Sequence, residues 1–156
     1  MVPKMPVVKD YYNSSMVIAD WAVELDAIVN AIKKLDSMGL DAMSDPIENL
    51  TGEAVLIALS SEILKAAFVE EFNANLVSLG LGTYYTVTAT EVEAIQTAEQ
   101  WNKELDTIQS LQALVEKINN ATVTPADLLA VKAEAEQTQI AKDIFESVLA
   151  ANGIVI

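Results

Sequence analysis

Apolar residues recur every three or four positions along most of the chain, which is the spacing of one face of an α-helix. The pattern predicts four long helices, at about residues 10–37, 46–79, 89–119 and 125–151. In three of them the apolar positions form a single stripe. The stripes are Ile18, Ala22, Leu25, Val29, Ile32 and Leu35 in the first, Ile95, Ala98, Leu105, Ile108, Val115 and Ile118 in the third, and Leu129, Ala133, Ile140, Ile144 and Val148 in the fourth.

Residues that favour helix starts and stops lie at the ends of these stretches. Start signals are Asp45 before Pro46, Thr88 three residues before Glu91, and Thr124 before Pro125, and the stops are Gly39, Gly80, Gly82 and Gly153. The connections are short, so consecutive helices should run antiparallel. We expect an all-α fold, an antiparallel four- to five-helix bundle, in a single domain over residues 1–156. The fifth helix arises if the second stretch divides near Thr51–Gly52, where Thr51 can cap a new start.

The second stretch differs from the others because its apolar residues cover most of the helix circumference. They are Val55, Leu56, Ile57, Leu59, Ile63, Leu64, Phe68, Val69 and Phe72. A helix that is apolar on all sides is normally buried on all sides. Three arrangements would achieve this: a central helix wrapped by the others, the wall of an apolar cavity, or an interface between chains.

Charge and composition exclude several functional classes. The net charge is −14, there are 9 Lys and no Arg, and His and Cys are absent. Such a chain repels nucleic acid, which is bound mainly through cations on its phosphates. It has no His- or Cys-based nucleophile pair, no usual zinc or haem ligands and no disulfide. Adjacent carboxylates such as Glu70–Glu71 are typical of a solvated helix face. We therefore expect no catalytic residue, metal or cofactor.

Polar residues on apolar stripes are the best candidates for a binding site. Gln112, Gln137 and Ser60 interrupt such stripes, and a buried polar group without a partner costs about 1–3 kcal/mol. They either bond within the bundle or hold the polar end of an apolar guest, with Lys65 or Lys103 at the rim. For the second case, the predicted ligand-binding residues are Leu56, Leu59, Ser60, Ile63, Trp101, Leu105, Ile108, Gln112, Gln137 and Ile140.

Three Asn residues, Asn13, Asn49 and Asn120, each stand two positions before Ser or Thr, the acceptor pattern for N-glycosylation. Such matches either reflect the composition alone or indicate a secreted glycoprotein. The first ten residues do not resemble a signal peptide, so in a secreted protein we expect that any leader has been removed.

Three segments carry a resemblance to a known family: MVIADWAVELDAIVNAIKKLDS, TVTATEVEAIQTAEQWNKELDTIQSLQALVEKI and TPADLLAVKAEAEQTQIAKDIFESVLA. With the second stretch, they resemble the fungal hydrophobic surface-binding protein A and cell-wall galactomannoprotein family in pattern and order. The resemblance implies a secreted or cell-wall helical bundle that binds hydrophobic surfaces or encloses a fatty acid. It supplies no catalytic residues.

Three functions remain open on the sequence alone. The first is a non-enzymatic carrier that sequesters an apolar small molecule, such as a fatty acid or another lipid, inside the bundle. The second is a structural or interaction protein that oligomerises or binds hydrophobic surfaces through its apolar second helix. The third is an extracellular four-helix sensor domain.

Overall fold

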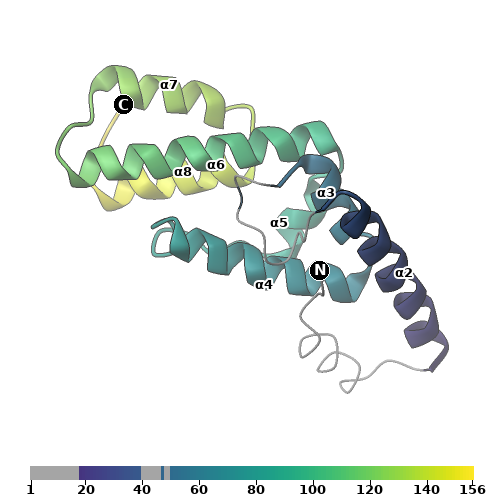
Figure 1. Ribbon diagram of the computed structural model, residues 1–156. Helices are drawn as coiled ribbons and strands as arrows, with labels where there is room; N and C mark the ends of the chain where they lie inside the picture. The colour runs from purple at the N-terminus through teal and green to yellow at the C-terminus, as the bar shows by residue number, and fades with distance from the viewer. Residues whose placement is uncertain (1–17, 40–46, 48–49) are drawn as a thin grey trace.

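The computed structural model describes residues 18–39, 47 and 50–156, and these residues form helices and turns without a β-strand (Figure 1). The all-α prediction is confirmed. The helices are α2 (Ile18–Ser37), α3 (Gly52–Ala58), α4 (Glu62–Ser78), α5 (Ala89–Ala94), α6 (Ala98–Asn119), α7 (Pro125–Ala135) and α8 (Ile140–Ala151).

Each of the last three predicted helices is divided in two. The start at Thr51 is confirmed, because its side chain accepts a hydrogen bond from the Ala54 amide and caps α3. A second break follows at Ser60–Ser61, where Ser61 caps α4. A capping box at Thr97 starts α6, and the fourth stretch breaks between α7 and α8. The uninterrupted helices predicted over 89–119 and 125–151 were therefore wrong. The second stretch divides near Thr51–Gly52, as the sequence analysis allowed, and also at Ser60–Ser61.

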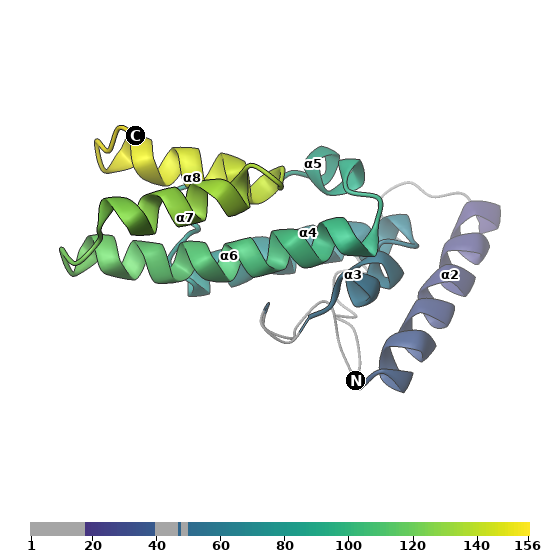
Figure 2. The same cartoon turned by 90° about the horizontal axis from the view of Figure 1, so that it is seen from above.

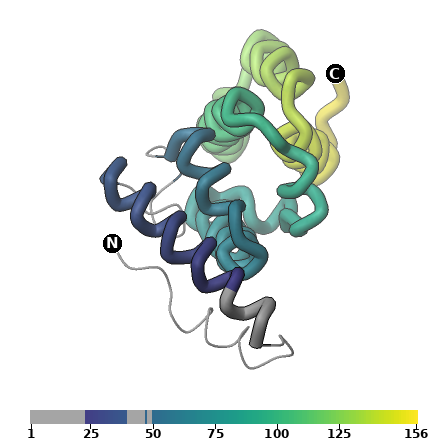
Figure 3. Tube along the Cα trace, turned by 90° about the vertical axis from the view of Figure 1, so that its right-hand side faces the viewer, coloured from purple at the N-terminus to yellow at the C-terminus, as the bar shows by residue number. Residues whose placement is uncertain are grey.

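Helix α6 lies at the centre of the arrangement. It contacts α3, α7 and α8, and α7 and α8 pack together along one side of it (Figure 2). Helix α2 contacts α3 and α4 instead, and it lies on the outer side of them, away from α7 and α8 (Figure 3). The long axis of the molecule is thus α6, with α2 at its periphery.

The buried apolar residues form two clusters of unequal size. The main core draws on every helix of the described residues and contains Trp101 of α6. The Trp101 ring lies edge-on to Phe68 and Phe72 of α4, with ring centroids 5.7 and 6.1 Å away. The smaller one, which we call the α2 cluster, joins α2 to α4 and consists of Ile28, Ala31, Ile63, Leu64 and Ala67. From α2, the main core receives Leu35.

These two clusters explain the apolar circumference of residues 54–72. One side of α4 faces α2 through Ile63 and Leu64, and another side faces the main core through Phe68 and Phe72. Most of the segment is therefore covered by its own chain. The larger half-buried apolar side chains are the exception, and they are Leu56 and Ile57 of α3, Leu59 just after it and Val69 of α4.

Two of the predicted stripes point partly in the wrong direction. In α2, Ile28, Ala31 and Leu35 are buried, whereas Leu25 and Val29 are 44% and 40% exposed. The α2 helix packs with a face next to the predicted one, and the side chains of residues 18–22 lie outside the described residues. In the fourth stretch, Leu129 and Ala133 are exposed, because the break after α7 resets the helical phase.

Candidate functional site

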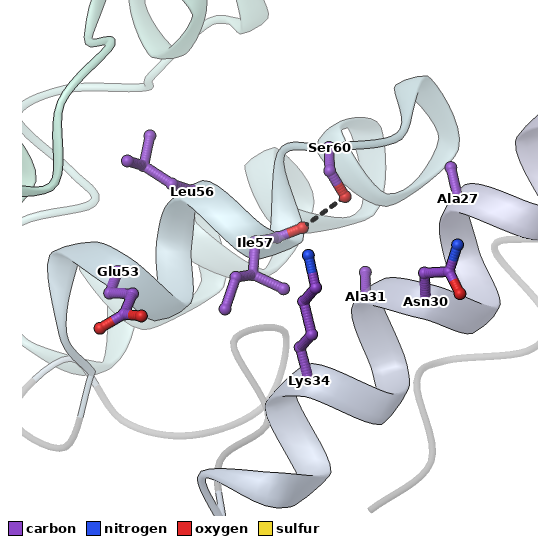
Figure 4. Close-up of a pocket in the computed structure, with 8 residues that line it drawn as sticks. All are labelled: Ala27, Asn30, Ala31, Lys34, Glu53, Leu56, Ile57 and Ser60. Atoms are coloured by element: carbon purple, nitrogen blue, oxygen red, sulfur yellow. Dashed lines mark hydrogen bonds between the residues drawn. The ribbon is translucent and has the colours of Figure 1, made fainter.

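A groove with a volume of about 410 Å³ lies between α2 and α3 (Figure 4). We call it the α2–α3 groove. Its apolar lining residues are Ala27 and Ala31 on α2 and Leu56 and Ile57 on α3, and its polar ones are Asn30, Lys34, Glu53 and Ser60. The groove borders the half-buried apolar side chains of α3, so it exposes some of the apolar surface that the rest of the chain leaves uncovered.

The small side chains of α2 create the space for this groove. Ala27 and Ala31 are one helical turn apart and therefore share a face, and neither fills the gap towards α3. Ile57 projects from α3 into the gap and packs against both the main core and the α2 cluster. The floor of the groove is thus apolar and is held by two rigid elements.

Among the polar residues of the groove, the ammonium group of Lys34 is available to bind a guest. Lys34 extends from α2 towards the end of α3, and no described residue forms an ion pair with its ammonium group (Figure 4). The Ser60 hydroxyl donates to the Ile57 carbonyl oxygen at 2.7 Å, so its proton is already engaged. Lys34 and the Asn30 amide can therefore donate to an oxygen atom of a guest.

The ten predicted ligand-binding residues do not form one site. Leu56 and Ser60 line the α2–α3 groove. Four of the others are buried in the main core: Trp101, Leu105, Ile108 and Ile140. Ile63 is buried in the α2 cluster. Leu59 and Gln112 are half-buried, and Gln137 is exposed. The prediction assumed helices that run unbroken through positions where the chain actually turns.

Two of the polar residues predicted to point inwards do not. Gln137 is exposed in the turn between α7 and α8, and Ser60 is exposed in the turn between α3 and α4. The two Lys residues considered for the rim are engaged elsewhere. Lys65 lies 2.7 Å from Glu62 and 2.5 Å from Glu93, and Lys103 lies 3.8 Å from Glu99.

The most unusual polar residue is one that the sequence pattern did not single out. Glu104 on α6 is 2% exposed, and its carboxylate accepts hydrogen bonds from the first amides of α8: Gln139, Ile140 at 3.0 Å and Ala141 at 2.8 Å. Burial raises the pKa of Glu104, while these backbone donors act against the rise. Since Gln139 provides no side-chain cap, Glu104 caps α8 in its place. Its role is structural.

A second polar cluster also ties helices together. The Tyr85 hydroxyl lies within hydrogen-bond distance of Glu91 on α5 and of Asp143 on α8. Burial raises the pKa of Tyr85, and the two carboxylates raise it further, so the phenol stays protonated. In the described part of the chain, no group of three or more acidic residues could hold a metal ion.

No family model, curated protein or solved structure matches this chain. The resemblance to the fungal family therefore stays a prediction. Among the helices of the described residues, none combines the length and hydropathy that a membrane crossing requires. A functional proposal must consequently be argued from the geometry of the groove and the surface.

Proposed function

We propose that the protein binds, without catalysing a reaction, an amphiphile with one aliphatic chain, such as a fatty acid, in the α2–α3 groove. The observation that supports this most directly is an apolar floor next to the ammonium group of Lys34, which forms no ion pair with a described residue. The aliphatic chain would lie on Ala27, Ala31 and Ile57. The carboxylate would accept hydrogen bonds from Lys34 and Asn30 at the rim.

The size of the groove supports this class of guest. Its 410 Å³ falls within the range of about 300–1,000 Å³ that is usual for small-molecule sites. Burying apolar surface stabilises a complex by about 25 cal/mol per Å², so the aliphatic chain would supply most of the affinity. The ion pair with Lys34 adds little, because an exposed pair is worth about 0.2–1 kcal/mol.

Displacement of a fluorescent fatty acid, measured with purified protein, tests the proposal. Ala27→Trp fills the groove and should abolish binding. Ala133→Trp places the same side chain on an exposed position of α7 and should leave binding unchanged. A wild-type protein that takes up no probe, or an Ala27→Trp variant that binds like wild type while keeping its fold by circular dichroism, would refute the proposal.

A second pair of measurements tests the orientation of the guest. Lys34→Met should weaken the binding of a fatty acid by up to about 5-fold, the equivalent of one exposed ion pair, and leave the binding of the corresponding fatty alcohol unaffected. Equal effects on the acid and the alcohol would place the carboxylate away from Lys34.

We also propose that the protein is secreted and carries a glycan on Asn120. Asn120 is the C-cap residue of α6 and is exposed in the turn before α7, so its side-chain amide is open to solvent. Asn13 and Asn49 lie outside the described residues. Expression through a eukaryotic secretory pathway should give a glycan mass that Asn120→Gln removes, and an unmodified Asn120 in that product would overturn the assignment.

A further inference from the structure

Helix α2 has an apolar face that the described residues leave partly open to solvent. Leu25 and Val29 are 44% and 40% exposed, and Ile32 is half-buried beside them. We call these three residues the α2 stripe. Their spacing of four and then three positions is that of the apolar seam of a coiled coil. The stripe lies to one side of the buried residues Ile28 and Leu35, and the α2–α3 groove lies to the other.

We propose that two copies of this chain associate through their α2 stripes, with the two α2 helices antiparallel and a two-fold axis beside Val29. In this arrangement Val29 meets Val29 of the second copy, and Leu25 meets Ile32 of the second copy. A two-fold interface is self-complementary, so one surface serves both copies. The inference does not depend on ligand binding, because Ala27, Ala31 and Lys34 of the groove stay free.

The charges beside the stripe select a second copy in the antiparallel orientation. Asp26 and Lys33 are seven residues apart and therefore flank the same edge of the seam. An antiparallel pair places each Asp26 opposite Lys33 of the other copy, so two ion pairs form across the axis. Both side chains are exposed, and neither forms an ion pair with another described residue.

The position of α2 also fits this partner. The helix has 20 residues and is therefore about 30 Å long, and it lies at the periphery of the molecule (Figures 1 and 2). An interface along α2 would therefore lie at the edge of the molecule, away from α7 and α8. A single pair of helices buries less surface than a standard interface, and each chain carries a charge of −14, so the dimer should be weak.

Sedimentation analysis at protein concentrations from micromolar to near-millimolar tests the dimer. The wild-type protein should shift from monomer to dimer with concentration. Val29→Asp should keep it monomeric, whereas Val23→Asp, the same change at a 70% exposed position on another face of α2, should not. A wild-type protein that stays monomeric throughout, or equal effects of the two variants, would overturn the proposal.

Two further variants test the antiparallel register. Asp26→Lys or Lys33→Asp alone should weaken association, and the double exchange should restore it. Because the chain has no Cys, Val29→Cys should form a disulfide-linked dimer on mild oxidation, while Val23→Cys should not. No recovery in the double exchange, or no selective crosslinking at position 29, would overturn the two-fold arrangement.

Discussion

Replacing Glu104 by Ala should lower the free energy of unfolding by about 2–4 kcal/mol. The carboxylate of Glu104 satisfies three amides at the start of α8, and the amides of Ile140 and Ala141 are buried with it. Each buried donor left without an acceptor costs about 1–3 kcal/mol. Removing the carboxylate also relieves the cost of burying its charge. The net loss of stability should therefore lie near the lower end of the summed cost of the unsatisfied amides.

The pH dependence of stability provides a second measurement on the same residue. Burial raises the pKa of Glu104 above 4.5, against the effect of the three amides, and Asp143 raises it further. Between the unfolded and the raised folded pKa, the folded chain binds more protons than the unfolded chain. The free energy of unfolding therefore falls as the pH rises through that window. Glu104→Gln removes this titration, so wild type should gain more stability than the Gln variant as the pH is lowered from neutral towards the ordinary pKa of a Glu carboxyl.

Urea unfolding, followed by circular dichroism, measures both effects. Glu116→Ala is the matched control, because Glu116 is an exposed carboxylate on the same helix, and its loss should change stability by less than about 0.5 kcal/mol. Two results would refute the reasoning. One is a Glu104→Ala variant that is as stable as the control, and the other is a Glu104→Gln variant with the pH dependence of wild type.

Three other substitutions can be tested by the same urea titration. The Trp101 indole N–H is buried without a hydrogen-bond partner among the described residues, so Phe at this position loses no hydrogen bond. Trp101→Phe should lower the free energy of unfolding by less than about 2 kcal/mol and Trp101→Ala by about 3–5 kcal/mol. Equal losses would contradict this. Gly52→Ala should cost about 1–3 kcal/mol, because the added Cβ would lie 1.9 Å from the Ala98 carbonyl oxygen, and an unchanged stability would show that α3 and α6 are farther apart. Asn73→Ala should cost about 1–3 kcal/mol, since it removes two hydrogen bonds of 2.9 and 2.8 Å to the Val87 backbone; a loss below 0.5 would mean that water replaces them.

Helical periodicity was sufficient to predict the fold class, but local capping signals were needed to place the breaks. Thr97 and Gln100 form a capping box that is visible in the sequence, and the periodic stretch over 89–119 masked it. The break before α8 has no such local signal. Its cap is Glu104, a residue 35 positions earlier in the chain, and only the folded arrangement brings the two together.

The candidate site illustrates a different limit of sequence reasoning. Helix α2 carries two neighbouring apolar faces, each with helical spacing. One consists of Leu25, Val29 and Ile32, and the other of Ile28 and Leu35. Periodicity cannot decide which set is buried, because that depends on how α3 and α4 pack against α2. The groove was equally unpredictable, since it depends on how α2 packs against α3.

The division of the buried residues into two clusters has a consequence for partial unfolding. Apart from Leu35, the buried residues of α2 belong to the small α2 cluster, so releasing this helix should need less free energy than unfolding α6. Backbone amide hydrogens of α2 should then exchange with solvent through an opening that leaves α6 protected. A ligand in the groove, or a second copy on the stripe, would slow exchange in α2 while that of α6 stays the same, so one exchange experiment would report on either event.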